Sequence, residues 1–373
     1  MGPGSVAAAS PARMHAMRRT GIAELPLHHG RAPRWLFERM VRLSRAMVLG
    51  MREDVPPSTI LVHLSDPYWF QAFGCVLGFD WHSSGLTTTV CGALKEALRG
   101  LEGDVGLFVT GGKGATSRRT PTEIVAAAHA LGRDLTPLAR ASRMAAKVDS
   151  AALQDGFELY HHTFVFTATG EWAVVQQGMS VATRYARRYH WLGERITTFV
   201  SEPHAAIVSD RRESAVLNLV AAESDAHRAA IVHAVHEESP EALVTMLRRL
   251  RLPARHPVVL DTDVAGPRVA RILLETYERR PANFEELLGL PGVGAKTLRA
   301  LSLAAEVMYG LPGSLRDPAA YSFAHGGKDG HPYPVDRQTY DGTIAFLEAT
   351  VRHARLGDRD RLAAFRRLAS LEL

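Results

Sequence analysis

The sequence predicts an α+β protein in which a mixed α/β domain is followed by an all-helical domain. Three observations support this. Strand-like alternation is interspersed with helical patterns from residue 18 to about residue 209. From about residue 210 to residue 373 only helical patterns and loops are found. A length of 373 residues leaves room for two domains, each with its own core.

Composition is typical of globular proteins. Hydrophobic residues make up 46% of the chain, and no apolar stretch approaches the ~18 residues that a membrane span needs. Two cysteines, Cys75 and Cys91, are too few for a disulfide scaffold or a four-cysteine zinc site. We therefore expect a cytoplasmic protein without a membrane partner. Residues 1–17 contain a Gly-Pro-Gly-Ser stretch typical of a protease-cleavage scar and are expected to be a disordered tail.

The charge balance favours an anionic partner. The formal net charge is +5, and 39 of the 44 basic residues are arginine. Arginine suits the recognition of phosphate groups, although GC-rich coding gives the same bias. The expected partner is DNA, most simply double-stranded, with a location at the nucleoid.

A glycine-rich segment in the first half is one candidate phosphate contact. A predicted strand over 105–110 runs into Gly-Gly-Lys-Gly, and a helix then opens at Thr120 with Glu123 in capping-box position. Glycine amides and a helix N-terminus favour anions, and Lys113, Arg118 and Arg119 add positive charge. The alternative is a flexible basic surface turn.

A second candidate follows a predicted β-hairpin over 157–177. The alternation of this hairpin lets only one of two adjacent histidines face the core. Beyond it, Arg184, Arg187 and Arg188 are interleaved with aromatic residues. Arginines neutralise phosphates and aromatic rings stack on bases, so this composition favours nucleic-acid binding. The alternative is a helix packed by its own rings.

No cofactor is expected in the preferred interpretation, but a metal site is an open alternative. Its candidate ligands are oxygen and nitrogen donors in the first half: Asp80, His82, His161, Glu202 and His204. Together they would suit a divalent metal in a hydrolytic nuclease. No two of them have a diagnostic spacing, and the Gln-Gln-Gly-Met sequence at 176–179 lacks the lysine of one common nuclease class.

The sharpest pattern lies at 283–309. Asn283 and Glu286 predict a capping box for a short helix, Leu-Pro-Gly-Val-Gly predicts a tight turn, and a second helix runs to a stop at Gly310. Without side chains on Gly292 and Gly294, the turn's amides can approach a phosphate at the positive end of the second helix. Thr297 and Arg299 follow in that helix.

This segment resembles the helix-hairpin-helix of DNA-binding and DNA-repair proteins, which implies contact with the sugar-phosphate backbone. In the DNA-glycosylase superfamily, bifunctional members carry a nucleophilic lysine two residues after the second hairpin glycine, and an aspartate follows in a Val-Asp context. The resemblance places Lys296 and Asp336 in these roles. The loop before Asp336 is longer than usual, and Arg337 replaces the usual threonine. The aspartate also suits a plain helix cap.

The chain further resembles the domain-of-unknown-function family numbered 763. The resemblance is carried by Phe-Asp-Trp-His-Ser-Ser-Gly at 79–85 and Gly-Gly-Lys-Gly at 111–114, and extends over nearly the full chain. It implies no activity. The combined expectation is a DNA repair enzyme that removes a damaged or deaminated base, with possible strand nicking by a lysine imine. The alternatives are a metal-dependent DNA nuclease and a non-catalytic binder of DNA structures.

Overall fold

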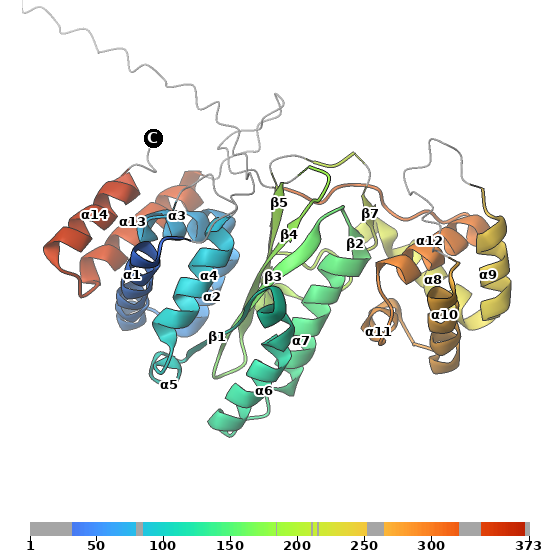
Figure 1. Cartoon of the computed structure of the whole chain (residues 1–373), viewed down its shortest axis with the longest axis horizontal. Coiled ribbons are helices and arrows are strands. Elements are labelled where there is room, and N and C mark those ends of the chain that lie inside the picture. The colour runs from blue at the N-terminus through green and yellow to red at the C-terminus, as the bar shows by residue number, and fades with distance from the viewer. Residues whose placement is uncertain are drawn as a thin grey trace, which may run out of the picture.

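The computed structural model describes residues 32–79, 85–183, 185–209, 212–214, 216–251, 265–320 and 337–369. The α+β class is confirmed, since helices lie on both sides of a five-stranded antiparallel sheet (Figure 1). The expected tail at 1–17 lies outside the described residues.

The sheet has the order β1-β3-β4-β5-β6, and every neighbouring pair is antiparallel. Its strands are β1 (Leu107–Lys113), β3 (Glu158–Thr167), β4 (Trp172–Met179), β5 (Ala186–Leu192) and β6 (Ala206–Val208). The predicted β-hairpin is confirmed as β3 and β4, which turn at Gly170 with a φ of 103°. A positive φ is readily adopted only by glycine, so this residue fits the tight turn.

Helices of the N-terminal region cover one face of the sheet: α1 (Arg34–Asp54), α2 (Pro57–Ser65), α3 (Pro67–Leu77), α4 (Gly85–Leu98) and the short α5 (Glu102–Val105). The two last helices, α13 (Arg337–His353) and α14 (Asp358–Ala369), return to this side and contact α1 and α3 (Figure 1). Together with strand residues such as Val165 and Val175 they enclose the first hydrophobic core.

The opposite face is covered by α6 (Thr120–Leu131) and α7 (Thr136–Lys147), and the remaining helices follow: α8 (Asp225–Glu237), α9 (Pro240–Arg249), α10 (Pro267–Arg279), α11 (Phe284–Gly289) and α12 (Ala295–Tyr309). Phe164, Phe166 and Trp191 join these helices in the second core. Successive residues of a strand point to opposite faces of the sheet. Val165 therefore lies in the first core, whereas its neighbours Phe164 and Phe166 lie in the second.

Because both faces are covered, the expectation that only one of His161 and His162 is buried is wrong. Their exposed fractions are 1% and 5%. Burial lowers the pKa of His161 to about 3, and it also lowers that of His162. Both imidazoles are therefore neutral in the folded protein at ordinary pH.

The second half of the chain is not wholly helical, in contrast to the prediction. β7 (Leu217–Asn218) pairs antiparallel with β2 (Leu153–Gln154) in a small separate sheet. Two residues are too few to produce a periodic pattern. Each core also contains residues from both sides of the predicted domain boundary at 209/210. No helix among the described residues is long and apolar enough to cross a membrane.

Candidate nucleic-acid interface

Two helices and a tight turn occupy the segment with the sharpest sequence pattern. α11 begins after Asn283, whose side-chain oxygen accepts a hydrogen bond from the amide of Glu286 at 2.9 Å. The carboxylate of Glu286 accepts from the amide of Ala282 at 2.9 Å, one residue earlier than a capping box requires. Leu287 and Leu298 are fully buried, so both helices are anchored in the second core.

The two glycines of the turn differ in what the fold demands of them. Gly292 has a φ of 83°, and a Cβ there would lie 3.2 Å from Cγ1 of Ile272. A side chain at this position would be strained. Gly294 has a φ of −140°, and a Cβ added there would have the Gly292 carbonyl oxygen as its nearest neighbour, at 3.9 Å. The fold therefore requires glycine at the first position only, and the second position leaves the backbone open to approach.

The turn is held from inside by one lysine. Lys147, the last residue of α7, donates hydrogen bonds to the carbonyl oxygens of Leu288, Leu290 and Val293 at 2.7, 2.5 and 3.2 Å. Partial burial lowers the pKa of this ammonium group. Within the described residues, no acceptor is found for the amides of Gly292 and Gly294. The carbonyl oxygens of the turn thus accept hydrogen bonds from the ammonium group of Lys147, whereas the amides of the two glycines can donate to a ligand.

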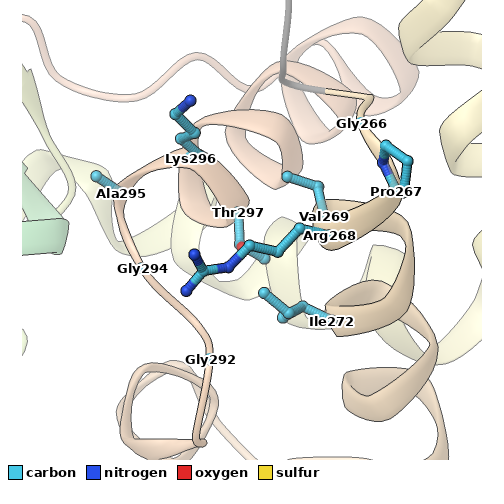
Figure 2. A pocket seen from close by; sticks show the side chains of 10 residues that line it. All are labelled: Gly266, Pro267, Arg268, Val269, Ile272, Gly292, Gly294, Ala295, Lys296 and Thr297. Atoms are coloured by element: carbon cyan, nitrogen blue, oxygen red, sulfur yellow. The ribbon is translucent and has the colours of Figure 1, made fainter.

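A groove of about 580 Å³ lies between the turn and the start of α10. Figure 2 shows the residues that line it: Gly266, Pro267, Arg268, Val269, Ile272, Gly292, Gly294, Ala295, Lys296 and Thr297. The N-terminal ends of α10 and α12 both meet this groove. Neither helix has a side-chain cap or an acidic residue in its first turn. Both instead carry an exposed cation there, Arg268 and Lys296.

The structure brings four predicted site residues to this groove: Gly292, Gly294, Lys296 and Thr297. Lys296 is exposed, and Figure 2 shows its side chain extending away from Gly292 and Ile272. Arg299 lies one turn further along α12 and donates from Nε to the side-chain oxygen of Gln154 at 3.0 Å, so it contributes to fixing α12 beside β2.

The comparisons with known proteins bear on family membership. A family model described as "Protein of unknown function (DUF763)" matches residues 21–335. The chain belongs to the DUF763 family. No curated protein and no solved structure matches the chain. The DUF763 match includes the groove and ends one residue before Asp336, which lies outside the described residues.

The DUF763 match also includes the glycine-rich segment, where the predicted local structure is partly wrong. β1 extends through Lys113, and the amide of Gly111 donates to the carboxylate of Glu123 at 2.8 Å. Glu123 also accepts from Lys95 at 2.7 Å, so it forms no capping box with Thr120. Because the amide of Gly111 already donates to the carboxylate of Glu123, it cannot donate to a phosphate at the same time. Exposed cations remain nearby: Lys113, Arg118 and Arg119.

The prediction that Arg187 and Arg188 contact DNA is wrong. They lie in β5, and their exposed fractions are 0% and 2%. Arg187 binds Asp155 at 2.9 Å and Asp317 at 2.7 Å. The two carboxylates neutralise the guanidinium of Arg187, which is buried inside the protein. Arg184 lies outside the described residues.

Arg188 has neighbours of a different kind. Its Nε donates to Nε2 of His190 at 2.8 Å, and the ring of Phe70 lies 4.7 Å from its guanidinium carbon. Burial lowers the pKa of Arg188 to about 9. Both arginines are therefore structural parts of the central sheet.

The metal alternative gains little from the geometry. His161 shares a hydrogen bond with Thr163, whereas His204 lies 2.5 Å from Asp149 through Nε2, beside Trp191. Glu202 is exposed, with its carboxylate 3.4 Å from Arg316. Among the residues that the structure describes, no group of three potential ligands is placed to hold a metal ion. Asp80 and His82 lie outside the described residues.

Sequence reasoning missed two contributors to the groove, Arg268 and Lys147. The Gly266-Pro267 pair was an available signal for the first, because proline is favoured in the first turn of a helix and so marks the start of α10. No signal was available for Lys147, which precedes the turn by more than 140 residues.

Proposed function

We propose that the protein binds duplex DNA through the sugar-phosphate backbone, using the turn between α11 and α12. One observation carries this proposal. The glycine amides of the turn lack acceptors within the described residues and lie where two helices begin without carboxylate caps. Amides at a helix N-terminus bind phosphate oxygens well, and such contacts position a protein without reading base sequence.

Electrostatics supports the same conclusion. The N-terminus of a helix carries about half a positive charge, so a cation in its first turn is unfavourable by about 0.3–1 kcal/mol. Arg268 occupies such a position in α10. An anion bound beside it would convert this unfavourable interaction into a favourable one. A groove built in this way is better suited to binding a phosphate than to stabilising the free protein.

The binding test uses the full-length protein and a labelled duplex, with fluorescence anisotropy measured over a series of salt concentrations. We expect the logarithm of the affinity to fall linearly with the logarithm of the salt concentration. Gly294→Asp should weaken binding at least tenfold, because its carboxylate repels phosphate. Glu241→Asp, at an exposed position in the first turn of α9, serves as the control. Absence of duplex binding at low salt would refute the proposal.

We further propose that the DNA is damaged and that the protein removes a base from it. In this reaction the amine of Lys296 attacks C1′ of the deoxyribose, the base leaves with the electrons of the glycosidic bond, and loss of the amine protons with opening of the sugar ring gives an imine. Support comes from the exposed position of Lys296 at the border of the groove. Asp336 is proposed as the electrostatic partner of the developing positive charge.

Borohydride reduction tests this reaction, since it traps the imine as a covalent protein–DNA adduct. We expect an adduct with lesion-bearing duplexes that disappears in Lys296→Ala and is unaffected by a chelator. Cutting that a chelator abolishes would instead indicate a metal-dependent nuclease. Binding without any product would indicate a non-catalytic DNA-binding protein.

A further inference from the structure

The groove is lined by a threonine whose hydroxyl group the fold leaves unused among the described residues. Thr297 is only 2% exposed, and its side chain lines the groove (Figure 2). Among the described residues its hydroxyl has no hydrogen-bond partner. The hydroxyl oxygen is not among the fully buried atoms that lack a partner, so the little surface that Thr297 exposes includes this oxygen and opens into the groove. A ligand in the groove can therefore reach it.

The charge around this hydroxyl suits a doubly charged anion. The starts of α10 and α12 each supply about half a positive charge, and the guanidinium of Arg268 supplies one more, which gives roughly +2 before Lys296 is included. A phosphate monoester at neutral pH carries a charge of about −1.5 to −2. A phosphodiester within an intact strand carries only −1.

The shape of the site makes the same distinction. A phosphodiester within a duplex is linked to a sugar on both sides, so it lies along a protein surface. A terminal phosphate has one ester link and three free oxygens, and it can enter a groove end-on. Such a group can turn its free oxygens toward the hydroxyl of Thr297 in the lining of the groove. Val269 and Ile272 add an apolar wall at the same groove, against which the last sugar can pack.

We propose that this groove binds the terminal phosphate monoester of a DNA strand, as found at a nick, a gap or an end. This inference rests on the proposed DNA binding and specifies its preferred form. The turn amides, the first-turn amides of α10 and α12, Arg268 and the hydroxyl of Thr297 together supply donors for the three free oxygens. A 5′-phosphate and a 3′-phosphate have the same chemistry, and the experiment distinguishes them.

The test compares the affinities of the full-length protein for four duplexes with hairpin-closed ends. One is intact, and the other three contain a single nick with a 5′-phosphate, a 3′-phosphate or hydroxyl groups only. We expect one phosphorylated nick to bind at least tenfold more tightly than the hydroxyl nick at equal salt. Thr297→Val, which removes the hydroxyl and keeps the branched shape of the side chain, should reduce this preference, the ratio of the affinities for the phosphorylated and hydroxyl nicks, to less than threefold.

The matched control is Thr276→Val in α10. Thr276 is 1% exposed and donates its hydroxyl to the carbonyl of Leu273 at 2.8 Å, so this variant should keep the preference. Thr297→Ser retains a hydroxyl and should also keep it, which guards against a folding defect in the valine variant. Equal binding of phosphorylated and hydroxyl nicks, or an unchanged preference in Thr297→Val, would overturn the inference but not the proposed DNA binding. Failure to bind any of the four duplexes would refute the proposed function itself.

Discussion

Lys147 offers a direct test of how the turn is held in place. Its ammonium group donates to three carbonyl oxygens of the hairpin at 2.5 to 3.2 Å. A hydrogen bond that involves a charged group contributes about 1.5–3 kcal/mol. The three bonds share one partly buried charge and are not additive, so we expect Lys147→Met to destabilise the hairpin by about 3 kcal/mol in total. Methionine keeps the apolar part of the side chain and removes only the donor.

Amide hydrogen exchange measures this local effect. The amides of Leu290 and Leu298 are bonded within the hairpin, to the carbonyls of Leu287 and Gly294. A loss of about 3 kcal/mol corresponds to exchange that is roughly 100-fold faster at these two amides, since each 1.4 kcal/mol is a factor of ten. DNA affinity should fall at least fivefold, because the turn loses its fixed geometry.

The control is Lys95→Met, which removes another partly buried lysine that donates to a carbonyl, here that of Gly111, and to Glu123. This variant should be less stable overall, with exchange at Leu290 and Leu298 accelerated no more than at other protected amides. If Lys147→Met left these two amides unchanged, Lys147 would not hold the turn and the reasoning would be refuted.

Three further predictions follow from single side chains. Gly292→Ala should lower the free energy of unfolding by about 1–2 kcal/mol, whereas Gly294→Ala should change it by less than about 0.5 kcal/mol. Gly294→Ala should nevertheless weaken DNA binding. Equal losses of stability for the two variants in urea titrations would contradict the geometry of the turn. Arg187→Met leaves two buried carboxylates without the guanidinium and should lower the free energy of unfolding by about 3–5 kcal/mol. The folded fraction of this variant should bind DNA as the unmodified protein does. A lower DNA affinity of the folded variant would indicate that Arg187 does take part in binding. The free energy of unfolding should fall as the pH is lowered from about 6.5 toward 3, because His161 is protonated in the unfolded chain but not in the folded protein. His161→Gln should reduce this pH dependence, measured by urea titrations at several pH values. An unchanged pH dependence in the variant would argue against a neutral, buried His161.

Local patterns predicted those elements whose determinants are close in sequence. The β-hairpin at 158–179 and the helices on both sides of the glycine turn follow from alternation, caps and turn residues within a few positions. Gly292 was correctly linked to a tight turn for the same reason.

Other expectations failed because the deciding partner is remote. Arg187 reads as a surface cation until Asp317 is seen, 130 residues later in the chain. Glu123 has the position of a capping residue, but the amide of Gly111 and the ammonium of Lys95 are its partners in the fold. The groove likewise depends on α10 meeting α12, and no local pattern specifies that contact.

The shared cores determine how the molecule can be dissected. α12 belongs to the second core, whereas α13 and α14 lie on the first, across the sheet (Figure 1). A fragment that starts at residue 210 would separate both groups of helices from the strands that cover them. Leu287 and Leu347, which are fully buried in the intact chain, are among the apolar residues that such a fragment would expose to water. The glycine turn is thus no portable module that can be grafted or expressed alone, and its chemistry depends on strands from the other half of the protein.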